Sequence, residues 1–217
     1  MNETKEAGSV AKPKRVRRGQ TRQDKIVERR LSLLEATLRV VARKGLIGTT
    51  MNDIASEAGC AYGVVAFHFK SKEGIMLAAL DHMVEEYDRT LALPRLKTPE
   101  ARLKAMINLD FDSTVSDSGR IAVFTAFWAE AARNPEYRKR CAELKARYHD
   151  RTVADVAELA SRYGKSLDAH LVARSLNALI DGLWIARQVL EPANAPGRGK
   201  AKEACLFYLR LIFPDSF

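Results

Sequence analysis

The chain has 217 residues, and 36 lysines and arginines against 27 aspartates and glutamates give it a formal net charge of +9. Hydrophobic residues make up 47% of the chain, which is enough to bury a core and excludes a disordered or fibrous protein. Three widely separated cysteines indicate neither a disulfide framework nor a zinc finger, and no stretch is typical of a signal peptide or membrane span, so a cytoplasmic protein without a membrane partner is expected.

The positive charge is concentrated near the amino terminus. Residues 1–23 have a net charge of +5 and residues 24–70 a net charge of +2. Clustered basic residues gain affinity by displacing counterions from phosphates, so nucleic acid is the favoured partner, and a solubilising tail is the alternative. Residues 1–22 have no apolar periodicity and are expected to form a disordered basic arm. Its candidate DNA contacts are Arg15, Arg17 and Arg18.

From Asp24 onward the apolar residues follow a helical period, and no alternating strand pattern competes with it. A first helix is expected to run from Asp24 to Gly45, with its apolar face at Val27, Leu31, Leu34, Leu38 and Val41. Two short helices follow, and then longer ones at 71–94, 103–111, 121–132, 134–164, 168–190 and 199–212. The expected fold is therefore all-α, with about nine helices.

The two short helices are expected at Met51–Ala58 and Ala61–Phe69, on either side of Gly59. Two short helices joined by a tight turn are the layout of a helix-turn-helix. Ile54 and Val65 are placed to seal the inner faces of the pair. An ordinary corner between helices of a bundle is the alternative, but the basic flank is an independent feature, and together the two favour DNA binding.

This region resembles the signature of the TetR family of bacterial repressors. The resemblance rests on the motif TMNDIA-x-x-AG at residues 50–59 and on VVAFHFKSKEGI at residues 64–75. It implies that the second short helix enters the major groove of double-stranded DNA. The DNA-binding residues that it implies are Thr50, Ala61, Tyr62, Gly63, Phe67, His68 and Lys72. Of these, Ala61, Tyr62 and Gly63 would face bases, and Thr50, His68 and Lys72 would hold phosphates.

Two positions depart from the family pattern. Most members have a tyrosine where this chain has Ala66, so one expected phosphate contact is missing. Ala61 stands where the recognition helix usually begins with serine or threonine, and the loss of that cap weakens the helix start by about 1 kcal/mol. Neither change removes the motif.

The rest of the chain is longer than DNA reading requires. A helix-turn-helix domain at 23–72 leaves residues 73–217, which are expected to form a larger helical domain for effector binding and dimerisation. The segments 168–190 and 199–212 have apolar residues on more than one helix face, so packing inside one bundle would cover only some of them. These two segments are therefore the candidates for a homodimer interface. A symmetric dimer would place two recognition helices roughly 34 to 36 Å apart and predicts a palindromic operator.

Three stretches of this second domain are similar to the BetI-type branch of the TetR family, the choline-responsive repressors of betaine synthesis. They are FDST at 111–114, AFWA at 126–129 and ALIDGLW at 178–184. Aromatic rings with a carboxylate bind quaternary ammonium ions, so a small-molecule effector of this class is a candidate. The candidate effector-binding residues are Asp112, Phe124, Phe127, Trp128, Asp181 and Trp184. The alternative is that the rings form ordinary core and that Asp181 pairs with Arg174 or Arg187.

No catalytic motif, cofactor motif or metal motif is found, so an enzyme is not expected. His82 and Glu86 lie one helical turn apart, but no third metal ligand is expected near them, and a polar helix face is the favoured interpretation. The predicted function is a ligand-responsive transcriptional regulator, most simply a repressor. The alternative is a dimeric DNA-binding regulator whose carboxyl-terminal domain binds a protein partner or no small molecule.

Overall fold

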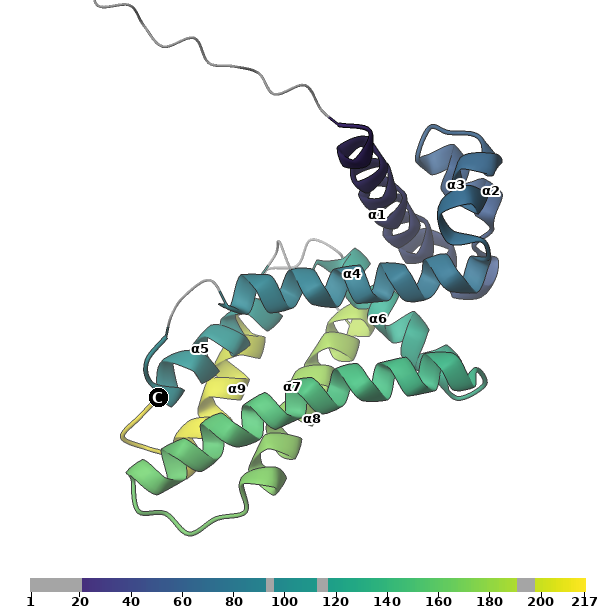
Figure 1. The fold of residues 1–217 in the computed structure, drawn as a ribbon. Coiled ribbons are helices and arrows are strands. Elements are labelled where there is room, and N and C mark those ends of the chain that lie inside the picture. The colour runs from purple at the N-terminus through teal and green to yellow at the C-terminus, as the bar shows by residue number, and fades with distance from the viewer. Residues whose placement is uncertain (1–20, 93–95, 113–116, 191–197) are drawn as a thin grey trace, which may run out of the picture.

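The computed structural model describes residues 21–92, 96–112, 117–190 and 198–217, and in these ranges the chain forms nine helices and no strands (Figure 1). This confirms the predicted all-α fold. None of the helices in these ranges has the length and apolar character needed to cross a membrane. The helices are α1 (Arg22–Gly48), α2 (Met51–Glu57), α3 (Tyr62–Phe69), α4 (Lys72–Ala92), α5 (Pro99–Asp110), α6 (Ser118–Ala131), α7 (Pro135–Arg162), α8 (Ala169–Leu190) and α9 (Arg198–Ile212).

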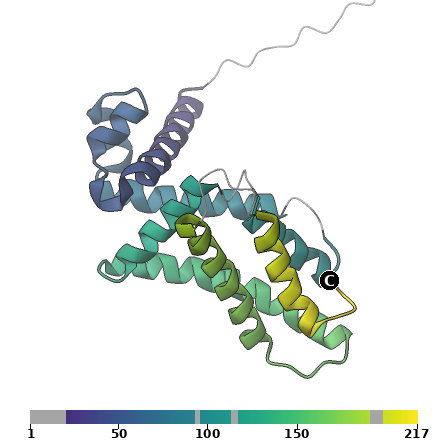
Figure 2. The ribbon, with the colours of Figure 1, turned by 180° about the vertical axis from the view of Figure 1, so that it is seen from behind.

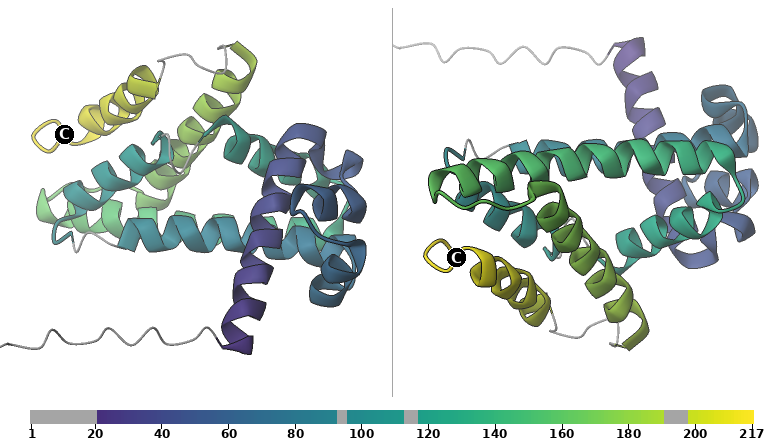
Figure 3. Two further views of the ribbon diagram at one scale, coloured as in Figure 1. Left: turned by 90° about the horizontal axis from the view of Figure 1, so that it is seen from above. Right: turned by 90° about the horizontal axis from the view of Figure 1, so that it is seen from below.

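Helix α1 begins with a capping box. The Thr21 hydroxyl accepts a hydrogen bond from the Asp24 amide at 3.1 Å, and the Asp24 carboxylate accepts one from the Thr21 amide at 2.9 Å. The later residues of the predicted apolar face are buried, but Val27 and Leu31 are 49% and 44% exposed. The reason is that the first turns of α1 extend past the other helices (Figure 3). Seen from above and below, α1 crosses α4 near the amino-terminal end of α4 (Figure 3).

Helices α2 and α3 form the predicted helix-turn-helix. Gly59 lies between them with φ at +61°, a conformation that glycine adopts without steric cost. The Cys60 amide reaches back to the Ala55 carbonyl at 2.9 Å and so closes the end of α2. Ile54 and Val65 are both fully buried, which confirms that they seal the inner faces of the pair.

The remaining helices form a bundle. Helix α4 leaves the helix-turn-helix and runs across one side of this bundle, as Figure 1 shows from the front and Figure 2 from behind. Helix α7 is the longest, with 28 residues, and begins where the sequence predicts: the Asn134 side chain accepts hydrogen bonds from the amides of Glu136 and Tyr137 at 2.9 and 3.2 Å. Helices α8 and α9 pack on each other, and α8 also packs on α7.

The apolar core has two parts that meet at α6. One part contains buried residues of α1 to α4 together with Val123 and Phe127 of α6 and Tyr137 of α7, and the other contains residues of α5 to α9. Phe124 and Trp128 of α6 pack against both parts. The expected boundary between residues 72 and 73 is therefore crossed by continuous packing of α6 on α1.

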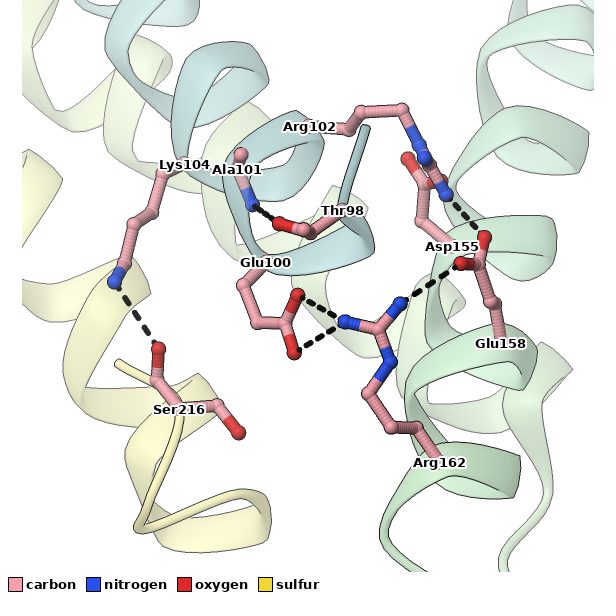
Figure 4. Close-up of polar contacts among 9 residues, drawn as sticks. All are labelled: Thr98, Glu100, Ala101, Arg102, Lys104, Asp155, Glu158, Arg162 and Ser216. Atoms are coloured by element: carbon pink, nitrogen blue, oxygen red, sulfur yellow. Dashed lines mark hydrogen bonds and ion pairs between the residues drawn. The ribbon is translucent and has the colours of Figure 1, made fainter. Parts of the chain in front are cut away.

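Ion pairs fasten α5 to α7 (Figure 4). Arg102 of α5 binds Asp155 of α7 at 2.5 Å and also pairs with Glu158. Arg162 of α7 binds Glu100 of α5 at 3.0 Å. Partly exposed pairs contribute about 0 to 1 kcal/mol each. Their main effect is geometric: they hold α5 in place, and with it the carboxyl-terminal end of α5, which reaches into the bundle.

Gly74 generates a prediction about stability. It lies in the first turn of α4, where its amide donates to the Ser71 hydroxyl at 3.0 Å, and a Cβ atom on it would lie 2.7 Å from the Phe69 carbonyl oxygen. We expect Gly74→Ala to lower the free energy of unfolding by about 1 to 3 kcal/mol, because the obstructing atom is backbone. Gly63→Ala is the matched control, since no atom lies within 4 Å of the added methyl group. Urea unfolding of both variants tests this, and equal stability of the two would contradict it.

Candidate DNA-binding surface and ligand cavity

Helix α3 has a buried side and an exposed side. Val65 is fully buried, whereas Tyr62 and Phe67 are 52% and 76% exposed. Ala61 and Gly63 are exposed as well. Two aromatic rings held in solvent on one short helix are costly in water and are typical of a contact surface. The structure thus brings the sequence candidates for base contact together on the solvent side of α3.

The amino-terminal end of α3 has no side-chain cap. Ala61 occupies the capping position and makes no side-chain hydrogen bond to the helix, in agreement with the departure noted in the sequence. The Val64 amide donates to the Ala61 carbonyl at 3.0 Å, which leaves the amides of Tyr62 and Gly63 at the helix start for an external acceptor such as a phosphate oxygen. The other candidates for DNA contact, Arg15, Arg17 and Arg18, lie outside the residues that the structure describes.

Two of the candidate phosphate-binding side chains already have partners within the chain. The Thr50 hydroxyl accepts from the Asp53 amide at 3.1 Å and donates to the Asp53 carboxylate at 2.8 Å, which caps α2. The Lys72 ammonium donates to the carbonyl of Ile47 at 3.0 Å. In this conformation the two side chains stabilise the junctions between helices, and a phosphate would compete with those contacts.

The third candidate, His68, is half-buried next to an arginine of α1. Arg30 donates to the His68 carbonyl at 3.2 Å, and its guanidinium lies 4.2 Å from the centre of the Phe69 ring. Burial lowers the pKa of His68, and the positive charges of Arg30 and Arg29 lower it further. The imidazole is therefore held toward its neutral form. Arg30, which sequence inspection did not single out, attaches the end of α3 to α1.

Other basic residues of α1 pair with acidic residues of α2. Arg39 and Arg43 both bind Glu57, at 2.7 and 2.5 Å. Lys44 binds Asp53 at 2.7 Å, and this contact is the main cause that lowers the pKa of Asp53 to about 2. These three basic side chains hold α2 on α1, so part of the positive charge counted in this region serves the fold.

A cavity of about 80 Å³ lies among α4, α6, α7 and α8. Four of the candidate effector-binding residues line it: Phe124, Trp128, Asp181 and Trp184. The two tryptophan rings are nearly parallel, with 6.4 Å between their centres and 7° between their planes. Phe124 stacks on Trp184 with ring centres 5.8 Å apart. The structure therefore assembles an aromatic wall from α6 and α8.

Two of the candidates do not line this cavity. Phe127 is 1% exposed and packs edge-on against Tyr137, with ring centres 5.2 Å apart, in the core shared with α1. It is the neighbour of Trp128 on α6, and adjacent residues of a helix point in different directions. Asp112 is half-buried beyond the end of α5 and does not reach the cavity.

The buried carboxyl group of this region is that of Asp110, the last residue of α5. Its side chain is almost completely buried and accepts hydrogen bonds from Tyr87 at 2.9 Å and Tyr148 at 2.5 Å. The Trp184 ring nitrogen donates to its main-chain carbonyl at 2.9 Å. Burial raises the pKa of Asp110 to about 7, although the two tyrosine hydrogen bonds and the nearby charge of Lys145 act to lower it. Burial thus outweighs the two hydrogen bonds and the nearby positive charge.

Sequence inspection missed Asp110, although the necessary signal was present. Leu103, Ile107 and Asp110 follow the spacing of one helix face, so a carboxyl group falls on the buried side of α5. Tyr87 and Tyr148 fall among the apolar residues that follow the helical period of the segments 71–94 and 134–164. What the sequence did not show is that these three side chains meet at one point.

Asp181 has a partner that the sequence did not suggest. The ammonium of Lys145 on α7 lies 2.6 Å from both Asp181 carboxylate oxygens and 4.5 Å from the centre of the Trp128 ring. Burial raises the pKa of Asp181, and the charge of Lys145 acts in the opposite direction. The partner of Asp181 is thus a lysine of another helix, where the sequence suggested Arg174 or Arg187.

His82 and Glu86 of α4 do have an acidic neighbour in space, which corrects the expectation that no third group is near. Glu35 of α1 lies 2.8 Å from the His82 ring, and candidate ligand atoms of the three residues lie within 4.8 Å of one another. Arg120 of α6 binds Glu86 at 2.7 Å and supplies the positive charge of the group. These four residues form an ion-pair network that joins α1, α4 and α6.

Comparison with known proteins identifies both halves of the chain. A family model described as bacterial regulatory proteins, tetR family, matches residues 33–79. A second, described as BetI-type transcriptional repressor, C-terminal, matches residues 99–214. The HTH-type transcriptional regulators BetI of Burkholderia cenocepacia J2315 and Burkholderia pseudomallei 668 are each 31% identical over 160 residues, which are 72% of this chain and 80% of theirs.

Solved structures have the same fold. A transcriptional regulator of Pseudomonas aeruginosa PAO1 superposes with a TM-score of 0.72 at 23% identity, over 92% of this chain and 96% of its own. A regulator of Saccharomonospora viridis, solved in complex with choline, superposes with a TM-score of 0.74 at 26% identity, over 85% of this chain and 96% of its own. The relatives are transcriptional regulators and not enzymes. This chain therefore belongs to the TetR family of bacterial transcriptional regulators, with a carboxyl-terminal domain of the BetI type.

Proposed function

We propose that this regulator is a repressor that binds a palindromic operator as a homodimer and is released from it by a small cationic effector. Residues 23–72 bind DNA, residues 1–22 add a basic arm whose last two residues, Thr21 and Arg22, begin α1, and residues 73–217 bind the effector and form the dimer. The protein acts in the cytoplasm. The observation that carries the proposal is the aromatic cavity with its carboxyl groups, which lies where the two parts of the core meet.

The DNA contacts follow from the exposed side of α3. Tyr62 lies beside Gly63, where little side chain obstructs it, and its ring fits against a thymine methyl group or its hydroxyl donates to a base edge. Phosphates are bound at the helix ends around this face, where N–H groups and basic side chains are present. The residues assigned to DNA are Arg15, Arg17, Arg18, Thr50, Ala61, Tyr62, Gly63, Phe67, His68 and Lys72.

The dimer is formed through α8 and α9. Ile185 and Val189 are exposed one turn apart on α8, and Phe207 and Leu211 are exposed one turn apart on α9. Apolar side chains arranged in this way on neighbouring helices indicate a protein contact surface. A second copy of the chain covers it by two-fold symmetry, so that the two α3 helices reach successive turns of the major groove.

The chemistry of the cavity selects a cation. Asp88 is paired with Arg151 at 2.6 Å, and Asp181 with Lys145, but the side-chain partners of Asp110 are two tyrosine hydroxyls. A carboxyl group without a basic partner beside stacked aromatic rings favours an ammonium group with no hydrogen-bond donors of its own. The choline bound to the Saccharomonospora viridis regulator belongs to this class. We therefore assign the effector to the small quaternary amines, with Phe124, Trp128, Trp184 and Asp181 as contacts and Asp110 as a second carboxyl group that faces the cation.

Helix α4 links the cavity to the DNA-binding domain. It begins directly after α3, and its Tyr87 contacts Asp110 in the cavity wall. Between these points His82 binds Glu35 of α1, so displacement of α4 is transmitted to the helix-turn-helix. An effector that binds better to a state with altered spacing of the two recognition helices shifts the population toward that state, and the operator is released.

Substitutions of Tyr62 and Lys72 test the contacts to bases and the contacts to phosphates separately. We expect Tyr62→Ala to weaken binding to the promoter DNA of the regulated gene by about 1 to 3 kcal/mol and to leave binding to random DNA unchanged, because the ring contacts bases. Lys72→Ala should weaken both about equally and reduce the slope of log affinity against log salt by about 1. Fluorescence anisotropy at several salt concentrations measures this. Parallel losses for the two variants would contradict the assignment.

A charged substitution on the exposed apolar side of α8 tests the proposed dimer surface. We expect Ile185→Glu to convert the dimer to monomer, because a carboxylate would be buried at the centre of an apolar contact. Leu31→Glu is the matched control, since Leu31 is equally apolar and 44% exposed but lies on α1. Sedimentation velocity gives the mass of each variant. A dimeric Ile185→Glu protein would rule out this part of α8 as the interface.

Effector binding is expected to depend on pH through Asp110. A bound cation favours the ionised carboxylate, and Asp110 has a pKa of about 7, so affinity for choline should rise as the pH increases. From about pH 6 to about pH 8 the gain is about tenfold, the change in the ionised fraction. The groups that face Asp110 are Tyr87 of α4, Tyr148 and Lys145 of α7, Asp181 of α8 and Cys205 of α9. Asp110→Asn should bind choline with no such gain.

The chain offers a direct readout, because both of its tryptophans, Trp128 and Trp184, lie in this cavity. Intrinsic fluorescence therefore reports choline binding at each pH. An unchanged pH dependence in Asp110→Asn would show that another group is responsible. Operator binding that no quaternary amine weakens would favour the alternative function, a regulator whose carboxyl-terminal domain binds a protein partner or no small molecule.

A further inference from the structure

We propose that Lys145 is a built-in competitor of the effector: its ammonium occupies the cation position of the cavity and leaves when the ligand binds. This inference rests on the proposed function, since it concerns the same cavity. It assigns to Lys145 the control of both affinity and charge selectivity. None of the stretches on which the family resemblance was based includes this residue.

The position of the ammonium is the one that a ligand cation would take. The Lys145 nitrogen lies 4.5 Å from the centre of the Trp128 ring and 5.9 Å from that of Tyr148. It contacts both carboxylate oxygens of Asp181 at 2.6 Å. Ring faces and a counter-charge are the elements by which proteins bind quaternary ammonium groups. In this structure the chain itself provides the cation.

The space beside Lys145 is small. The cavity of about 80 Å³ is roughly half the size of the engineered apolar cavity of about 150 Å³ that binds benzene. A trimethylammonium group cannot share the Trp128 face with the lysine ammonium, because the two have the same charge and need the same volume. The ligand must therefore displace the end of the Lys145 side chain.

Displacement of Lys145 is feasible. Its side chain is 40% exposed, so the ammonium has a path to water along the surface of α7. One cation then replaces another, and Asp181 keeps a positive partner. A neutral molecule of the same shape would leave the carboxylate of Asp181 without its counter-charge in a partly buried site, which is unfavourable. The exchange thus selects for charge as well as for shape.

The experiment compares two ligands on matched variants. Choline is the cationic probe, and 3,3-dimethyl-1-butanol, in which carbon replaces the nitrogen, is the neutral one. Lys145→Met removes the competing charge and retains most of the side-chain length. Lys139→Met is the control, because Lys139 is an exposed lysine of the same helix that does not line the cavity. Dissociation constants come from tryptophan fluorescence, on full-length protein with thermal unfolding as the check of folding.

We expect Lys145→Met to bind choline about tenfold more tightly than the wild type, which corresponds to the loss of one cation–π contact and one partly exposed ion pair. Lys139→Met should bind choline like the wild type, and the wild type should prefer choline to the neutral alcohol. Lys145→Gln provides a second variant if the methionine protein does not fold. Asp181→Asn should bind choline more weakly than the wild type, because the shared counter-charge is lost.

The outcomes distinguish this inference from the proposed function. If the wild type binds choline and Lys145→Met binds it equally well or less well, Lys145 is not a competitor, and the assignment of the effector class survives. If neither the wild type nor the Lys145 variants bind choline, both are overturned, because removal of a competitor must leave an open cation site.

Discussion

A buried carboxyl group at the end of α5 constrains the effector domain. The Asp110 side chain can be removed from water only if hydrogen-bond donors surround it, since an unpartnered carboxyl group in the interior is strongly unfavourable. Tyr87 of α4 and Tyr148 of α7 provide these donors, and Trp184 of α8 binds the carbonyl of the same residue. Three helices are therefore positioned relative to α5 by one residue, and the ligand cavity lies among them.

The cavity is also coupled to the DNA-binding half by packing. Phe124 and Trp128 of α6 touch both parts of the core, and α6 packs directly on α1. The Glu35–His82 and Glu86–Arg120 pairs join α1, α4 and α6 at their crossing. Close-packed interiors transmit strain, and Phe124 and Trp128 in the cavity wall contact neighbours in both parts of the core. The two halves of the chain are thus parts of one packed structure.

Charge serves different purposes in different places. In the helix-turn-helix, Arg39, Arg43 and Lys44 bind acidic residues of α2 and stabilise the domain. In the effector domain, Lys145 neutralises Asp181 next to an aromatic ring. A count of net charge therefore overstates the positive charge that is available to DNA, and it does not show that Lys145 lies in the wall of the cavity. The role of each basic side chain depends on where its acidic partner lies.

The sequence by itself determined the helices, because apolar period, capping residues and glycines act over short distances: Gly59, Asn134 and the buried face of α5 lie where the pattern places them. It also determined the helix-turn-helix, whose motif is local, and four of the residues in the cavity wall. The sequence could not show that Trp128 lines the cavity and Phe127 does not, because these two neighbouring side chains point to different parts of the core. Only the tertiary structure decided that Asp110 meets Tyr87 and Tyr148, and that Lys145 reaches Asp181. These contacts join residues 23 to 38 positions apart, and the direction of a side chain relative to another helix is set by packing, which no local pattern encodes.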